Sequence, residues 1–308
     1  ALTKGAMQDV SIMLLDKPTM PKKADAFPSY LLAGLKGGLI GLGVSVLLLI
    51  VVAVFRRTIL DKNDVKEILG MDYVAKVPLV EKRHPNNPGL LLNGIGIRAD
   101  FKHSFHNIRI KMEQDHRKNK NSVYMITSTV PNEGKTTVSI NTAITLGQKG
   151  YKVCLVDLDM RNPSVEKTMR YANIHRTSLD YINDKDVNLA QCIVHKDDID
   201  VIFGSDISVD GSTELAKPRL ENLITELREV YDFIILDVAP LYMMEDALLV
   251  AKYADSAVVV VKQDYAEARD ILDSVDELHD TLPHIVGVVL NSYKKTFYSS
   301  ESTGYGYG

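Results

Sequence analysis

The chain has 308 residues, a formal net charge of −4 and two cysteines. This length leaves room for one large α/β domain with additional segments, and the weakly acidic balance argues against a nucleic-acid partner. Cys154 and Cys192 have neither disulfide nor metal-ligand spacing, which is consistent with a reducing compartment around the folded domain. Because the chain begins with Ala1, we expect it to be a piece of a longer protein.

A polar segment over residues 1–30 precedes an uncharged apolar stretch at residues 37–55. At a rise of about 1.5 Å per residue, roughly 19 helical residues span about 28 Å, close to the ~30 Å hydrocarbon core of a bilayer. We therefore expect a transmembrane helix over residues 31–57, since a buried core helix is rarely so long or so uniformly apolar. Arg56 and Arg57 at its end favour a cytoplasmic location for the C-terminal part of the chain.

Residues 58–98 are expected to form a linker that contains a short helix at 64–69 and a short strand at 73–78. A longer helix is predicted over residues 99–117, because large apolar residues recur there every three or four positions and form one stripe. These residues are Phe101, Phe105, Ile108 and Met112.

The segment Ser128–Thr137 lies between a predicted buried strand at 123–126 and a predicted helix at 138–146. A strand, a tight loop, Gly-Lys-Thr and a helix form the layout of a P-loop, although Thr129 replaces the first glycine of the usual pattern. Backbone N–H groups of such a loop bind nucleotide phosphates, and its lysine reaches the β- and γ-phosphates. The loop residues predicted to contact the nucleotide are Pro131, Asn132, Glu133, Gly134, Lys135, Thr136 and Thr137.

Two further predicted strands end in carboxylates. Asp157 and Asp159 follow residues 152–156, and Asp237 follows residues 232–236. Ligands bind at the carboxyl ends of strands in open α/β sheets, and Mg²⁺ beside a triphosphate is held through one or two carboxylates. We therefore predict an ATP site in which Mg²⁺ is bound by Thr136, Asp159 and Asp237, and in which Arg161 and Asn291 also contact the nucleotide. For any single aspartate, the alternative is that it caps the next helix.

The chain beyond the P-loop alternates near-continuous Val/Ile/Leu strands with helices. Strands are expected at residues 152–157, 200–203, 256–262 and 285–290, and helices at 164–171, 213–231, 245–253 and 266–280. This alternation predicts a P-loop NTPase-like α/β domain over residues 99–291, with a mostly parallel sheet covered by helices on both faces and one transmembrane helix before it. Residues 292–308 are rich in Ser, Gly and Tyr and are expected to form a disordered tail.

Three motifs together resemble those of the bacterial P-loop protein-tyrosine kinases of capsule and exopolysaccharide export. They lie at residues 129–136, 155–161 (Leu-Val-Asp-Leu-Asp-Met-Arg) and 235–240 (Ile-Leu-Asp-Val-Ala-Pro), and the resemblance covers residues 60–308. It implies an ATP-dependent protein-tyrosine kinase that is anchored in the bacterial plasma membrane with its kinase domain in the cytoplasm. It also implies that residues 1–30 are the extracytoplasmic tail of a co-polymerase-like domain.

In a kinase of this kind, Lys135 would stabilise charge on the phosphates, Asp157 would receive the tyrosine proton and Asp159 would support the metal or the incoming hydroxyl. The tail would be autophosphorylated, and the predicted acceptors are Tyr293, Tyr298, Tyr305 and Tyr307. The partners that the resemblance implies are the plasma membrane, polysaccharide polymerase and export proteins, a tyrosine phosphatase and further copies of the chain in a ring-like oligomer.

The chain departs from the family in its Glu-x-x-Arg-x-x-Arg signature for ring assembly. These positions fall on Ala99, Lys102 and Phe105, so that only the charge of Lys102 is retained. An ordinary helix that covers the sheet is at least as well supported as an assembly surface. A partition-type P-loop ATPase is a second hypothesis, but its signature lysine would fall on Val130. A third is a non-catalytic, nucleotide-sensing adaptor that sets polysaccharide chain length by assembly alone.

Overall fold

The computed structural model describes residues 28–55, 57–81, 84–173, 175–205, 211–242 and 245–294. The chain divides into two compact units, residues 1–56 and residues 57–308. Residues 1–27 of the expected extracytoplasmic tail lie outside the described residues, as do the predicted acceptors Tyr298, Tyr305 and Tyr307.

The first unit contains helix α1 (Pro28–Phe55). Its segment Tyr30–Val51 has 22 residues and a mean hydropathy of 2.1, and the apolar side chains along it are exposed. Among the described residues, α1 is the one helix that is long and apolar enough to cross a membrane. The hydroxyl of Ser45 donates to the carbonyl of Gly41 at 2.9 Å, so this polar group has a partner within the helix.

The second unit is built on one eight-stranded sheet with the strand order β1-β8-β7-β2-β6-β3-β5-β4. All neighbouring strands are parallel except β4 and β5, which confirms the predicted mostly parallel sheet. The strands are β1 (Tyr73–Pro78), β2 (Val123–Ser128), β3 (Val153–Asp157), β4 (Val194–Lys196), β5 (Ile199–Ile202), β6 (Phe233–Asp237), β7 (Ser256–Lys262) and β8 (Ile285–Tyr293).

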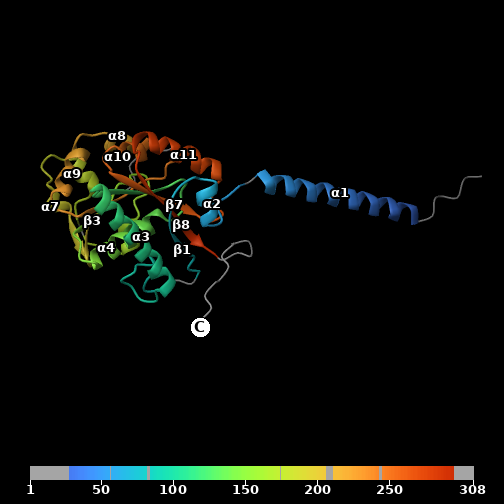
Figure 1. The fold of residues 1–308 in the computed structure, drawn as a ribbon, viewed down its shortest axis with the longest axis horizontal. Coiled ribbons are helices and arrows are strands. Elements are labelled where there is room, and N and C mark those ends of the chain that lie inside the picture. Colours follow the sequence, from blue (N-terminus) through green and yellow to red (C-terminus); the bar gives the residue numbers. More distant parts are fainter. Residues whose placement is uncertain are drawn as a thin grey trace, which may run out of the picture. The chain divides into compact units, whose positions relative to one another are not determined.

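Helices cover both faces of this sheet (Figure 1). On one face, Tyr124 and Ile126 of β2 belong to the core beneath α3 (Ala99–Asn119), α4 (Lys135–Gln148) and α5 (Val165–Met169). On the other face, Val123 and Met125 belong to the core beneath α2 (Lys62–Glu67), α6 (Ser178–Asn183), α7 (Leu189–Cys192), α8 (Gly211–Leu215), α9 (Arg219–Arg228), α10 (Glu245–Ala251) and α11 (Ala268–Thr281). Successive residues of β2 thus point to opposite faces, as a strand requires.

Helix α3 carries the apolar stripe that the sequence predicts. Phe101, Phe105, Ile108 and Met112 are all buried, and the rings of Phe101 and Phe105 lie 5.0 Å apart. Phe105 is therefore a core residue, whereas Ala99 and Lys102 are exposed. The three positions of the family's assembly signature do not form one surface in this chain.

Two predicted boundaries are wrong. The helix expected over residues 213–231 is two helices, because Pro218 stands at the N-cap of α9 and has no N–H to continue α8. Strand β8 runs to Tyr293 rather than Leu290, and the Tyr293 carbonyl accepts a bond from Leu79 N at 3.0 Å. Tyr293 is therefore part of the sheet and not of a tail.

The segment expected to be a linker, residues 58–98, supplies α2 and the edge strand β1 to the second unit. The predicted short helix and short strand are present in it, but they pack as parts of the domain. At the opposite edge, the three-residue strand β4 (Val-His-Lys) was not predicted, because it has no apolar run to distinguish it from a loop.

Candidate nucleotide site

The loop between β2 and α4 contains two residues in the left-handed backbone region. Asn132 and Gly134 have positive φ angles of 67° and 90°, and a Cβ on Gly134 would come within 2.2 Å of Asn291 Nδ2. Gly134 is therefore required by both its conformation and its surroundings. Thr129, at the position of the first glycine of the usual pattern, has no positive φ, so a side chain is tolerated there.

A cavity of about 300 Å³ lies against this loop at the carboxyl ends of the strands. The predicted site residues that line it are Pro131, Asn132, Gly134, Lys135, Thr136, Thr137, Asp159 and Arg161. The remaining lining residues are Asn162, Ser164, Thr168, Ala239 and Pro240. The predicted residues Glu133, Asp157, Asp237 and Asn291 do not line this cavity but lie behind its wall, where their contacts hold the wall in place.

Lys135 lies among the carboxylates. Its Nζ is 2.5 Å from Asp159 Oδ2 and 3.9 Å from Asp237 Oδ2. Burial disfavours the charged ammonium, but the charges of Asp237 and Asp159 outweigh burial and raise the pKa of Lys135 above its usual value. The lysine is therefore protonated and ready to exchange its carboxylate partner for a phosphate oxygen.

Thr136 and Asp237, two of the three predicted metal ligands, are in direct contact. The Thr136 hydroxyl donates to Asp237 Oδ2 at 2.7 Å, and the Ser139 hydroxyl donates to Asp237 Oδ1 at 2.8 Å. Burial raises the pKa of Asp237, while the Lys135 charge and these two hydroxyls act in the opposite direction. Ser164, whose Oγ lies 2.8 Å from Thr136 Oγ1, completes the cluster.

These oxygen donors fit Mg²⁺, which is a hard cation. Among the described residues, no group of three or more His, Cys, Asp or Glu side chains could hold a metal by itself. In nucleotide enzymes, Mg²⁺ is usually held by one or two protein ligands and completed by phosphate oxygens and water.

Asp157 occupies a different environment from Asp159. It is 1% exposed, its Oδ1 accepts from Asp159 N at 3.1 Å, and its Oδ2 accepts from Ser164 N and Val165 N, each at 3.1 Å. Burial and the nearby charge of Asp237 raise the pKa of Asp157 to about 8, which would suit a proton acceptor. Its oxygens, however, serve the turn that leads into α5, so Asp159 is the carboxylate that faces the cavity.

Arg161 is held by a residue that the sequence did not point to. Its Nε and one terminal nitrogen donate to the two oxygens of Asp246, at 2.7 and 3.2 Å. Asp246 lies in the first turn of α10 and is fully buried. Ser139, Ser164 and Asp246 were all missed, since a serine or an acidic residue early in a helix is common and carries no distinctive spacing.

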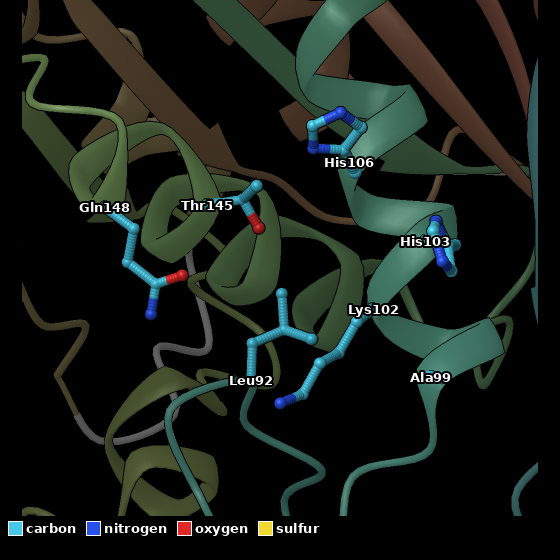
Figure 2. A pocket seen from close by; sticks show the side chains of 7 residues that line it. All are labelled: Leu92, Ala99, Lys102, His103, His106, Thr145 and Gln148. Atoms are coloured by element: carbon cyan, nitrogen blue, oxygen red, sulfur yellow. The ribbon is translucent and has the colours of Figure 1, made fainter.

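A second cavity of about 450 Å³ lies between α3 and α4, away from the carboxylates. Figure 2 shows its lining, with Lys102, His103 and His106 on α3 and Thr145 and Gln148 on α4. None of the described residues that line this cavity is acidic. It is larger than the cavity at the P-loop, but its described lining lacks the carboxylates that metal-assisted nucleotide chemistry needs.

Known proteins resemble this chain in sequence and in fold. A family profile described as an AAA domain matches residues 131–286, just over half of the chain. Tyrosine-protein kinase CpsD of Streptococcus pneumoniae is 29% identical over 173 residues, which cover 56% of this chain and 76% of that protein. Tyrosine-protein kinase etk of Escherichia coli K12 is 26% identical over 312 residues, which cover 94% of this chain and 41% of that protein.

The solved kinase domain of Escherichia coli tyrosine kinase ETK superposes with a TM-score of 0.69 at 25% identity, covering 80% of this chain and 99% of that domain. The chain spans about two fifths of the full length of etk and 39% of a Klebsiella pneumoniae relative. The chain thus belongs to the AAA domain family, and it resembles bacterial proteins named tyrosine-protein kinase in sequence and in fold.

Proposed function

We propose that this chain is a membrane-anchored, ATP-dependent protein-tyrosine kinase that autophosphorylates its C-terminal tyrosines and regulates capsular or exopolysaccharide polymerisation and export. The observation that carries the proposal is the position of Lys135, Thr136 and Asp159 on one cavity beside the Gly-Lys-Thr loop, with Asp237 hydrogen-bonded to Thr136 directly behind them. The names of the relatives CpsD and etk give the acceptor class.

The loop and the start of α4 would bind the phosphates of ATP through backbone N–H groups, and Lys135 would leave Asp159 to contact them. Mg²⁺, held by the Thr136 hydroxyl and the Asp237 carboxylate, would neutralise charge on the phosphates. Because Asp237 is fixed by two hydroxyls, its oxygen is already oriented when the metal arrives.

The tyrosine oxygen would form a bond to the γ-phosphorus as the bond to the bridging oxygen of ADP breaks, and the phenolic proton would pass to a carboxylate. We assign this carboxylate to Asp159, because it lines the cavity, whereas Asp157 accepts three backbone N–H groups behind it. A phenol has a pKa near 10, so the carboxylate mainly orients the hydroxyl and accepts its proton late.

Helix α1 supports the anchor. Its exposed apolar side chains would be costly in water and stable in a bilayer, so we propose that α1 crosses the plasma membrane and that the kinase unit lies in the cytoplasm with its ATP. Polysaccharide polymerase and export proteins, a tyrosine phosphatase and other copies of the chain are the partners that we propose.

The two alternative functions are less well supported. A partition-type ATPase needs a lysine where this chain has Val130, whose N–H donates to Glu133 at 2.9 Å. A non-catalytic adaptor would bind ATP at the same site without transferring phosphate, so only a transfer assay separates it from a kinase.

The test is a transfer assay with the full chain in detergent. The chain is incubated with radiolabelled ATP and Mg²⁺, and the phosphoamino acids are separated after acid hydrolysis. We expect phosphotyrosine in the wild-type chain and none in Lys135→Met. Bound ATP without any phosphotyrosine would replace the kinase with the adaptor.

A further inference from the structure

Glu133 is an acidic residue inside a loop that must bind anions, and its side chain is almost completely buried, with 1% exposed. Its Oε2 accepts from Val130 N at 2.9 Å, and its Oε1 accepts from Lys262 N at 3.0 Å. The N–H of Thr129 also favours the charged form of this carboxylate and so acts to lower its pKa. Glu133 does not line the phosphate cavity, so its charge is used inside the protein and is not directed at the nucleotide.

These contacts join three separate parts of the chain. Thr129 and Val130 lie at the start of the loop after β2, and Lys262 is the last residue of β7. The carbonyl of Glu133 accepts from Asn291 Nδ2 of β8 at 2.6 Å. The side chain of Glu133 therefore connects the start of the loop to β7, and its carbonyl connects the middle of the loop to β8.

We propose that Glu133 is a positioning residue that holds the phosphate-binding loop in its binding-competent shape before the nucleotide arrives. The proposal rests on the proposed function, in which this loop binds ATP. Asn291 acts in the same way from β8, and we therefore assign it to the support of the loop and not to direct contact with the nucleotide.

The physical reason is the fraction of time that the empty loop spends in the right conformation. The N–H groups of residues 132–135 would bind phosphate only when they converge, and a short loop without such contacts samples other conformations. Apparent affinity falls in proportion to the binding-competent fraction. A buried acceptor that receives the N–H groups of Val130 and Lys262 keeps that fraction high without occupying the phosphate site.

The Glu133 carboxylate destabilises the fold when it is charged. Burial raises the pKa of Glu133 to about 7, although the N–H groups of Val130, Lys262 and Thr129 favour the charged form. Lys262 of β7 is the charged side chain that faces it, while the loop and β8 contribute neutral groups. The folded state thus keeps a proton that the unfolded state releases, and this group's contribution to stability falls as the pH rises from about 4.5 to 7.

The test compares Glu133→Gln with Glu277→Gln in the full chain in detergent. Glu277 is an exposed glutamate on α11, so its variant is a matched control for the loss of one charge. At pH 8 the dissociation constant of a fluorescent ADP analogue is measured for each chain, and Tm is measured at pH 6 and pH 8.

We expect Glu133→Gln to bind about tenfold more weakly, because its amide offers one acceptor oxygen and a misplaced donor to N–H groups. The fall in its Tm between pH 6 and pH 8 should be smaller than in the wild type by about 2–4 °C. Loss of affinity together with a flatter pH profile distinguishes a positioning carboxylate from a residue whose replacement only damages the fold. Glu277→Gln should match the wild type in both measurements.

Asn291→Ala, which removes the tether from β8 and leaves the carboxylate intact, provides the second variant. It should weaken binding in the same direction and keep the wild-type pH profile. If Glu133→Gln binds the analogue as tightly as the wild type, the positioning role is wrong and the kinase proposal stands. If Glu133→Gln does not fold, equal affinity of Asn291→Ala and the wild type leads to the same conclusion. A wild-type chain that does not bind the analogue overturns both.

Discussion

The hydroxyl of Thr136 donates a hydrogen bond of 2.7 Å to Oδ2 of Asp237, although 101 positions separate the two residues. Thr136 lies in the first turn of α4, and Asp237 is the last residue of β6, the strand next to β2 in the sheet. The parallel pairing of β2 with β6 therefore brings a hydroxyl oxygen and a carboxylate oxygen together at the carboxyl edge. This is the pair of hard ligands that Mg²⁺ needs beside a nucleotide.

Asp237→Asn should weaken nucleotide binding only when Mg²⁺ is present. The variant removes a charged oxygen from the metal site, and we expect the affinity for Mg²⁺-ATP to fall by about ten- to a hundredfold. Isothermal titration with and without Mg²⁺ measures the difference. The control is Asp232→Asn, just before the start of the same strand, where the exposed carboxylate accepts from Lys152 N at 2.8 Å. An equal loss of affinity without Mg²⁺ would contradict the metal role.

Asp159→Asn and Asp157→Asn should differ in their effect on phosphate transfer. We assign Asp159 to the acceptor tyrosine, whereas Asp157 supports the cavity wall. With ATP at saturation, we expect the rate of transfer to fall by about a hundredfold in Asp159→Asn and by much less in Asp157→Asn. Rates are measured from single-turnover phosphorylation. If Asp157→Asn shows the larger loss, Asp157 receives the proton, as the sequence alone suggested, and the assignment to Asp159 is wrong.

The stability of the chain should fall as the pH rises from 6 to 9. The pKa of Asp157 is raised to about 8 by burial and by Asp237, and burial also raises the pKa of Asp237. The folded state therefore retains protons that the unfolded state has released, and unfolding becomes easier until the pH passes the folded pKa. Denaturant midpoints at pH 6, 7, 8 and 9 measure this trend. Mg²⁺ with ADP should reduce it by stabilising the charged carboxylates, and a midpoint that rises with pH would contradict it.

Asp246→Asn should weaken the contribution of Arg161 to nucleotide binding, because Asp246 holds the Arg161 side chain. The two-point contact is lost, and a buried site is left with an amide that faces a guanidinium. We expect a double-mutant cycle with Arg161→Ala to give a coupling energy of about 1 kcal/mol for nucleotide binding, because Arg161 is partly exposed. Additive effects of the two substitutions would show that the contact has no role at the site.

Much of this arrangement was predictable from the sequence, because near-continuous apolar runs mark the strands that position it. The runs at Val123–Ile126 and Phe233–Leu236 both precede polar residues, and parallel pairing then fixes their ends at one edge. The support behind the cavity was not predictable in the same way. Asp246 and Ser139 act only because folding brings distant elements together, and the tether of Glu133 to Lys262 spans 129 positions without any local pattern.

The predicted element boundaries were wrong where a proline or strand pairing overrode the local sequence pattern. Pro218 divides a helix whose hydrophobic period continues on both sides of it, so the period alone misled. Tyr293 follows the polar pair Asn291-Ser292, which looked like the beginning of a tail, yet pairing with β1 extends the strand across it. The Lys76 ammonium lies 4.8 Å from the centre of the Tyr293 ring, which further holds this tyrosine at the sheet edge.

The most direct measurement of the kinase activity is the mapping of phosphosites by mass spectrometry after incubation with ATP and Mg²⁺. We expect phosphotyrosine on Tyr305 or Tyr307 in the wild-type chain, less on Tyr293 because β8 holds it in the sheet, and none in Lys135→Met. We also expect the Lys135→Met chain to become labelled when it is mixed with an intact chain whose four predicted acceptor tyrosines are replaced by Phe. A wild-type chain that binds ATP and carries no phosphate on any tyrosine would contradict the proposed kinase activity.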